Sequence, residues 1–128
     1  RYGTVTGVQT CALPIFNELA PRPHNSGHYT IEACSFDQFD AHIRGIAGWP
    51  LEQPQLLKPA VMVNVLGQHV APTRALIADH PEWNVHDYCK AEVRHDRKMG
   101  HITVLTDDTA KTVADLEATG CWDDLKKA

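Results

Sequence analysis

The sequence lacks closely spaced cysteines, long apolar runs and an excess of positive charge. Its four cysteines, Cys11, Cys34, Cys89 and Cys121, are scattered without a CxxC pair, which argues against a zinc or disulfide framework. No apolar run approaches the ~20 residues that a membrane span needs, and no basic start precedes a long apolar core. The formal net charge of −4 argues against nucleic acid or an anionic membrane as a partner. We therefore expect a cytoplasmic protein with no membrane segment and no secretory signal.

The first fifteen residues, RYGTVTGVQTCALPI, differ from the rest of the chain. They carry one charge, have no clear hydrophobic period and contain breakers at Gly3, Gly7 and Pro14. The stretch VTGVQTCALPI can also be written in the codons of a common sequencing adapter. We expect residues 1–15 to be a non-native, adapter-like segment joined to a truncated reading frame. The alternative is a genuine edge strand and turn.

The remainder predicts an α+β domain with several strands and three short helices. Ser35 or Asp37 can cap a helix whose apolar residues recur at spacings of three and four, and Gly48 can end it. The apolar, β-branched run AVMVNVLG predicts a buried strand. The other expected elements are a short strand at about 29–33, a helix beginning at Pro72 and ending before Pro81, strands within VHDYCKAEV and GHITVLT joined by a charged turn, and a helix capped by Asp107 or Thr109 that ends near Gly120.

The first stretch with chemically capable side chains is a loop that holds two prolines, Pro21 and Pro23. Because proline fixes φ and removes a donor, we expect a stiff loop rather than a helix. Its carboxylate and amide oxygens suit Mg²⁺, and its arginine and imidazole groups suit a small anion such as carboxylate or phosphate. The polar residues of this loop are Asn17, Glu18, Arg22, His24, Asn25, Ser26 and His28.

The second stretch, HDYCKAEVRHDRKMGH, is rich in cations. Lys90 and Arg94 have even spacing, so an extended strand would place them on one face, with Arg97 on the turn beyond. Such a cluster would bind a phosphate monoester, since arginine offers a bidentate fork and lysine a point charge. A mixed-charge hairpin tip is equally typical of a solvated turn.

Other residues have plainer interpretations. The two histidines of HNSGH could hint at zinc, but no second cluster has ligand spacing. We expect His42 and His69 on the surface or on helix faces. Three tryptophans, Trp49, Trp83 and Trp122, are expected to pack in the core or at its rim, and Cys34, Cys89 and Cys121 to be small buried apolar residues.

Two long motifs resemble one family. NELAPRPHNSGHYTIEAC resembles the end of the ATP-grasp domain in 5-(carboxyamino)imidazole ribonucleotide synthases, and YCKAEVRHDRKMGHITV resembles the C-terminal hairpin of that family. The intervening segment LLKPAVMVNVLG is also similar in kind to the sequences of that family. The resemblance runs from about residue 16 to the end, and it implies the end of an ATP-grasp domain at 16–50 followed by a small β-rich C-terminal domain with short helices at 51–128.

The resemblance implies an ATP-dependent ligase of purine biosynthesis. In this family ATP phosphorylates bicarbonate to carboxyphosphate, and the amine of 5-aminoimidazole ribonucleotide is then carboxylated. A homodimer is the implied assembly. By motif position, Asn17 and Glu18 would bind ATP with Glu18 holding Mg²⁺, Arg22, His24 and Asn25 would hold bicarbonate or carboxyphosphate, and Lys90 and Arg97 would hold the phosphate of the ribonucleotide.

The sequence also departs from the family pattern. The N-terminal domain, most of the ATP-grasp domain, the lysines that contact ATP and the second acidic metal ligand of the family are not in the chain, so we expect the chain alone to have no synthase activity. Two other readings remain open. One is a non-catalytic module that binds a phosphate or nucleotide, and the other is a zinc-dependent hydrolase built on the histidines.

Overall fold

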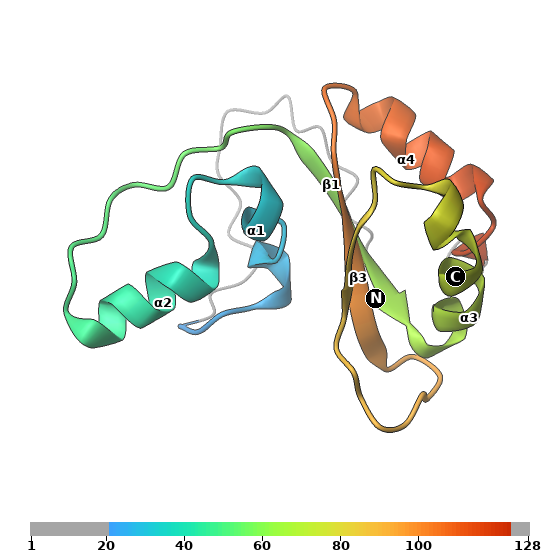
Figure 1. The fold of residues 1–128 in the computed structure, drawn as a ribbon, viewed down its shortest axis with the longest axis horizontal. Coiled ribbons are helices and arrows are strands. Elements are labelled where there is room, and N and C mark those ends of the chain that lie inside the picture. The colour runs from blue at the N-terminus through green and yellow to red at the C-terminus, as the bar shows by residue number, and fades with distance from the viewer. Residues whose placement is uncertain (1–20, 124–128) are drawn as a thin grey trace.

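The computed structural model describes residues 21–123 and contains helices packed on both faces of one small sheet (Figure 1). Within this part of the chain, every helix is too short or too polar to cross a membrane. The α-helices are α1 (Thr30–Ala33), α2 (Gln38–Ala47), α3 (Val70–Leu76) and α4 (Thr109–Ala118), the strands are β1 (Ala60–Leu66), β2 (Asn84–Asp87) and β3 (Lys98–Leu105), and three 3-10 turns cover Asn25–Gly27, Gly67–His69 and Ile77–Asp79.

The sheet is antiparallel, and β3 lies between β1 and β2. Val63 is opposite Ile102, which is opposite Val85 on the other side, whereas Asn64 and His86 both flank His101. Because side chains alternate along a strand, the first set lies on one face of the sheet and the second set on the other. The two faces therefore differ in chemistry, one apolar and one polar.

The hydrophobic core lies on the apolar face, beneath α3 and α4. Ile102 is fully buried there, and Leu116 of α4, Trp83 and Trp122 pack against the same cluster. The indole Nε1 of Trp122 donates a 3.0 Å hydrogen bond to the carbonyl of Asn64. This bond holds the segment after α4 against β1.

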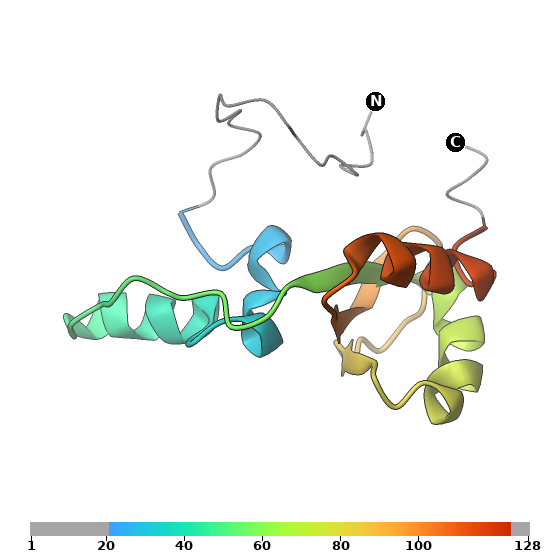
Figure 2. The same cartoon turned by 90° about the horizontal axis from the view of Figure 1, so that it is seen from above.

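The N-terminal elements lie on the other side of the sheet, and α2 projects away from it (Figure 2). Asp37 caps α2 by accepting hydrogen bonds from the backbone N–H groups of Phe39 and Asp40, and Gly48 ends the helix in the left-handed conformation at φ 66°. The expected cap and stop are confirmed. The apolar residues of α2 are nevertheless exposed, with Ile43 at 59% and Ile46 at 73%.

Several predicted elements were wrong in detail. The expected strand at 29–33 is the single helical turn α1, in which the Thr30 hydroxyl donates to the carbonyl of Gly27 at 2.6 Å. The helix expected from Pro72 begins at Val70. The predicted strand VHDYCKAEV ends at Asp87, and α4 is capped by Asp108 rather than by its neighbours. At α1 and α4 a side-chain hydrogen bond decides the local structure.

Burial also departed from expectation at individual residues. His69, expected on the surface or on a helix face, lies in the 3-10 turn before α3 and is 1% exposed, with its ring edge-on to the buried Trp122. Cys89 is exposed rather than buried, and Trp49 is 63% exposed. Trp83 and Trp122 are buried as predicted. The predicted adapter-like segment at 1–15 lies outside the described residues, and the boundary between 50 and 51 remains a prediction.

Candidate functional site

Four rings form a stack on the polar face of the sheet. His86 of β2 and His101 of β3 are cross-strand neighbours whose ring centroids lie 4.4 Å apart. His28, from the loop before α1, stacks on the other side of His101 at 4.8 Å, and Phe39 of α2 stacks on His28 at 5.7 Å. The stack therefore joins the N-terminal segment to the sheet.

Hydrogen bonds orient the three histidine rings of this stack. Nε2 of His86 lies 2.5 Å from a carboxylate oxygen of Glu32 in α1. Nδ1 of His101 shares a 2.9 Å hydrogen bond with the hydroxyl of Tyr88. The amide nitrogen of Gln38 donates to Nδ1 of His28 at 2.7 Å. Because the rings are oriented by three different elements, their positions depend on the whole fold rather than on one loop.

The surroundings of two rings of the stack, His28 and His101, lower their pKa and favour their neutral forms. His101 is 2% exposed, and burial, reinforced by repulsion from His86 and His28, lowers its pKa to about 4. Burial is also the largest cause of the lowered pKa of His28, followed by the charges of His86, His24 and Lys98. Burial raises the pKa of Tyr88. Near neutral pH the stack can therefore donate and accept hydrogen bonds without carrying a full set of positive charges.

The described part of the predicted anion-binding loop, residues 21–28, which we call the anion loop, lies directly beside this stack. Its backbone is held by Gln38, whose side-chain oxygen accepts a 2.8 Å hydrogen bond from the N–H of His24. The ring of His24 caps the 3-10 turn, since its Nδ1 lies 3.3 Å from the N–H of Ser26. Asn25 has a buried side-chain oxygen with no hydrogen-bond partner among the described residues. Arg22 is exposed and donates to the carbonyl of Pro23 at 3.2 Å.

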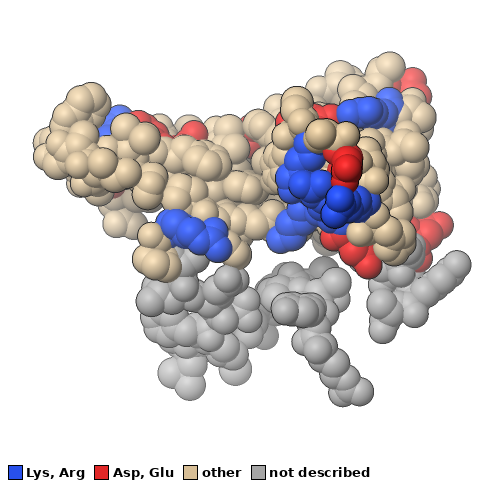
Figure 3. Space-filling view, turned by 90° about the horizontal axis from the view of Figure 1, so that it is seen from below, with Lys and Arg blue, Asp and Glu red and all other residues tan. Residues whose placement is uncertain are grey.

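The predicted phosphate residues occupy a loop at 88–97, not a strand. Because β2 ends at Asp87, Lys90 and Arg94 do not share a strand face, and that expectation was wrong. Nζ of Lys90 donates to the carbonyl of Lys98 at 2.6 Å and lies 5.5 Å above the ring of Tyr88. Arg97 donates to the carbonyl of Glu92 at 3.2 Å. Lysine and arginine side chains gather on the face of the molecule seen in Figure 3.

The loop at 88–97, which we call the cationic loop, is braced by the turn after β1. A side-chain carbon on Gly67 would lie 2.0 Å from the carbonyl oxygen of Arg94, so only glycine permits this approach. Next to it, the side chain of Gln68 donates to Asp96 at 3.0 Å and accepts from the N–H of Asp96 at 2.9 Å. Asp96 has a φ of 58°, a conformation that asparagine and aspartate tolerate better than most residues. The cationic loop is thus held in one arrangement.

The structure connects the two predicted loops through His28, for which no specific role was predicted, and through Tyr88 and His101. His28 contacts both His101 and Tyr88, and Tyr88 lies beneath Lys90. The histidines at the ends of HNSGH and in the hairpin are one signal for this connection, but the pairing of His86 with His101 depends on strand register. Asn17 and Glu18 lie outside the described residues.

Near the polar face lie buried oxygen and nitrogen atoms that make no hydrogen bond within residues 21–123. These atoms are Oε2 of Glu32, Oδ1 of Asn64, Nε2 of His101 and Oγ1 of Thr103. Buried polar groups ordinarily find partners, so such atoms suit ordered water or a polar ligand group. Within residues 21–123, no three or more His, Cys, Asp or Glu side chains are grouped as a metal site. The described part of the site is therefore suited to binding anions and hydrogen-bonding groups.

Family comparisons divide the chain into two parts. Residues 60–115 match the phosphoribosylaminoimidazole carboxylase C-terminal domain, and residues 10–39 match the ATP-grasp domain. The N5-carboxyaminoimidazole ribonucleotide synthase of Staphylococcus saprophyticus is 57% identical over 97 residues, which are 75% of this chain and 26% of that protein. The enzyme of Staphylococcus aureus strain COL is 52% identical over 103 residues, or 80% of this chain and 28% of that protein.

Solved structures give the same result. The N5-carboxyaminoimidazole synthetase of Staphylococcus aureus complexed with ADP is 52% identical, with a TM-score of 0.77 over 80% of this chain and 28% of that chain. The synthase of Aspergillus clavatus in complex with ADP and 5-aminoimidazole ribonucleotide is 34% identical, with a TM-score of 0.67 over 77% of this chain and 28% of that chain. The chain spans about a quarter of the length of the curated relatives that it matches.

Proposed function

We propose, from the premise that this chain belongs to the N5-carboxyaminoimidazole ribonucleotide synthase family, that it supplies the C-terminal part of an ATP-dependent ligase. That ligase would carboxylate 5-aminoimidazole ribonucleotide with bicarbonate through carboxyphosphate. The observation that carries the proposal is the contact between the two loops, since His28 and Tyr88 bring the anion loop and Lys90 to one face. Homodimer formation by the full-length protein is part of the same proposal.

The anion loop would hold bicarbonate or carboxyphosphate. Arg22 offers a cationic fork, and its exposure leaves the guanidinium accessible to an anion. His24 and Asn25 are positioned by the hydrogen bond from His24 to Gln38, so they need little rearrangement when a ligand arrives. Carboxyphosphate hydrolyses readily, and exclusion of water from this loop would be a second contribution of the chain.

The cationic loop would hold the phosphate of the ribonucleotide. Lys90 and Arg97 use backbone carbonyls as hydrogen-bond acceptors, at 2.6 and 3.2 Å. Neither cation is tied to a carboxylate by these bonds, so a phosphate could replace the carbonyls without breaking an ion pair. Arg94, by contrast, is paired with Glu92. The structure thus favours Lys90 and Arg97 over Arg94 for this role.

Magnesium and ATP are assigned to Asn17 and Glu18 by motif alone. Both residues lie outside the described part of the chain, and residues 21–123 offer no metal-binding group of three or more suitable side chains. Mg²⁺ bound with ATP would neutralise charge on the phosphoryl group that is transferred. The described residues would contribute by binding and orienting the two anions.

A chimera tests the proposal while supplying the remaining parts of the enzyme. Residues 21–128 of this chain would replace the matching region of the Staphylococcus aureus synthase, to which the chain is 52% identical. The readout is ADP release that requires both bicarbonate and 5-aminoimidazole ribonucleotide. We expect an active chimera, with KM for the ribonucleotide raised about tenfold or more by Lys90→Ala or Arg97→Ala, since charged hydrogen bonds contribute about 1.5–3 kcal/mol.

Two controls accompany these variants. Lys111→Ala removes an exposed lysine on α4 that pairs with Asp115, so it should leave KM unchanged. Arg94→Ala removes a cation of the same loop that is already paired and should have a smaller effect. A folded chimera in which Lys90→Ala and Arg97→Ala behave like Lys111→Ala would refute the phosphate assignment.

A non-catalytic phosphate-binding module is the second candidate, favoured by the way Gly67 and Gln68 fix the cationic loop. This reading predicts that the 128-residue chain binds ribose 5-phosphate without ATP, and that Lys90→Ala weakens this binding. Isothermal titration of the chain with ribose 5-phosphate measures this directly. An inactive chimera together with tight binding by the chain would favour the module over the ligase.

A further inference from the structure

One side chain at the start of α2 holds both ends of the last turn of the anion loop. Oε1 of Gln38 accepts a 2.8 Å hydrogen bond from the backbone N–H of His24, and Nε2 of Gln38 lies 2.7 Å from Nδ1 of His28. The turn between the two histidines packs closely on the same side chain, since a side-chain carbon on Gly27 would lie 2.5 Å from Oε1 of Gln38. Gln38 therefore contacts the loop at its beginning, along its turn and at its end.

The backbone of Gln38 is itself held in place. Gln38 is the first residue of α2, directly after the cap Asp37, and its N–H donates a 3.0 Å hydrogen bond to the hydroxyl of Thr30 in α1. That hydroxyl donates in turn to the carbonyl of Gly27 at 2.6 Å. The start of α2, the single turn α1 and the anion loop are thus joined at Gln38, whose side chain is in position before any ligand arrives.

These contacts determine which nitrogen of His28 carries its proton. A backbone N–H can only donate, so the side-chain oxygen of Gln38 faces His24 and its amide nitrogen faces His28. The amide nitrogen can also only donate, so Nδ1 of His28 accepts and the neutral ring carries its proton on Nε2. The lowered pKa of His28, for which burial is the largest cause, agrees with a neutral ring. Protonation of Nδ1 would place two donors against each other and break the contact.

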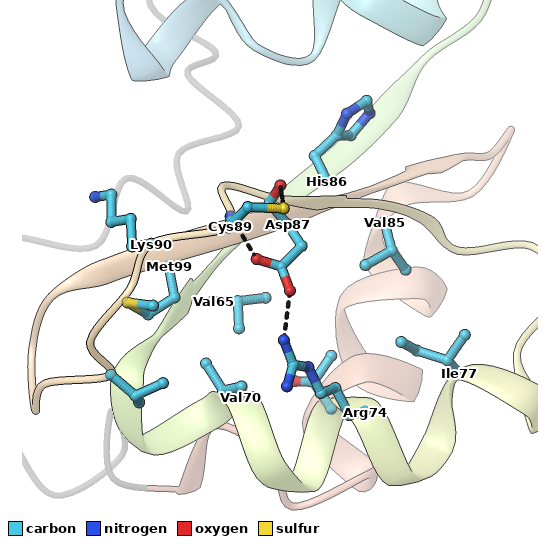
Figure 4. A pocket seen from close by; sticks show the side chains of 13 residues that line it. Val65, Val70, Arg74, Ile77, Val85, His86, Asp87, Cys89, Lys90 and Met99 are labelled. Carbon is cyan, nitrogen blue, oxygen red and sulfur yellow. Dashed lines mark hydrogen bonds and ion pairs between the residues drawn. The ribbon is translucent and has the colours of Figure 1, made fainter.

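The groups around His28 also oppose a charge on its ring. In Figure 4 the ion pair of Arg74 with Asp87 lies on one side of the sheet, and His86 points to the other side, toward the N-terminal elements. There His86 contacts Glu32 of α1, and its charge adds to burial in lowering the pKa of His28. The other side chains around His28 are those of His24 in the anion loop, Gln38 and Phe39 in α2, Tyr88 after β2, and Lys98 and His101 in β3.

We propose that Gln38 is the positioning residue of the anion loop, fixing the backbone at His24 and holding His28 as the Nε2–H tautomer. The inference rests on the proposed ligase, in which this loop holds bicarbonate or carboxyphosphate. Loss of the two contacts would free the residues that are to hold the anion, Arg22, His24 and Asn25. Binding of bicarbonate would weaken, whereas the cationic loop, which is braced by the turn after β1, would keep its arrangement.

Nitrogen NMR of the histidine side chains in the 128-residue chain tests the tautomer without any ligand. Above neutral pH we expect His28 in the Nε2–H form, with its signals identified by their loss in His28→Asn. Gln38→Glu offers an oxygen atom to each partner, so it should keep the contact with His24, convert His28 to the Nδ1–H form and raise the pKa of His28 by about one unit or more. An Nδ1–H ring in the unchanged chain, or the same tautomer in the unchanged chain and in folded Gln38→Glu, would overturn the proposal.

Kinetics of the chimera with the Staphylococcus aureus synthase test the consequence for the proposed reaction. Gln38→Leu preserves a helix-forming side chain of similar size but makes neither hydrogen bond, so it should raise KM for bicarbonate about tenfold and change KM for the ribonucleotide less than about twofold. Gln53→Leu, the same substitution at an exposed position between α2 and β1, is the matched control, and circular dichroism verifies folding. An active chimera in which Gln38→Leu behaves like Gln53→Leu would refute the positioning role. An inactive chimera would count against the ligase alone, and the tautomer of His28 would then decide the role of Gln38.

Discussion

Acidification should destabilise the fold through His101. Its side chain is 2% exposed, and burial lowers its pKa from 6.5 to about 4. In this range the unfolded chain binds a proton that the folded chain does not, so stability is complete above pH 6.5 and falls as the pH drops toward 4. For these two pKa values the loss between pH 7 and pH 5 is about 2 kcal/mol. The lowered pKa of His28 acts in the same direction.

Urea denaturation at pH 7 and pH 5 measures this effect, with the fluorescence of the buried Trp83 and Trp122 as the probe. The quantity of interest is the change in unfolding free energy between the two pH values, compared between the chain and its variants. His101→Asn and His101→Phe both remove the titrating group, and His101→Phe retains a ring for the stack. Each should reduce the pH-dependent change by about 2 kcal/mol.

Carboxylates distant from the stack contribute equally to the chain and to the variants, so the double difference reports His101 together with its coupling to His28 and His86. His42→Asn, on the exposed part of α2, should leave the pH dependence as it is in the unchanged chain. If both His101 variants lose as much stability between pH 7 and pH 5 as the unchanged chain, then His101 is not held neutral by its surroundings.

Three further predictions concern single substitutions. Gly67→Ala should lower the free energy of unfolding, measured by urea denaturation, by about 1–3 kcal/mol, because the added carbon would lie 2.0 Å from the carbonyl oxygen of Arg94. Gly45→Ala is the control: its added carbon would meet no atom within 4 Å, so it should be neutral or stabilising. Equal losses of stability in the two variants would contradict the close approach at Gly67. Asp37→Ala should lower the free energy of unfolding by about 1 kcal/mol and reduce the helical circular dichroism signal, because the cap of α2 is lost. Unchanged helicity would show that the cap contributes nothing. Ile46→Glu should reduce light scattering at high concentration, because this side chain is 73% exposed, whereas Ala47→Glu, which adds the same charge and removes no large apolar group, should have less effect.

Part of the candidate site could be predicted from the sequence because motifs and local signals identify residues one loop at a time. The prolines marked the anion loop, and the charges marked the cationic loop. Local patterns could not show that Gln38 holds both His24 and His28. Nor could they show that the cationic loop rests against Gly67. Those contacts join residues that are distant in sequence.

The sequence by itself determined the elements whose signals are local. The cap and stop of α2 at Asp37 and Gly48, and the apolar strand β1, follow from rules that act within a few residues. Tertiary structure decided which side chains meet. His101 lies opposite His86, and not opposite Val85 or Asp87, because of the register between β2 and β3. A shift of β3 by one residue would turn the His101 side chain to the opposite face of the sheet. No local preference of histidine encodes that register; it is set by packing of the apolar face around Ile102.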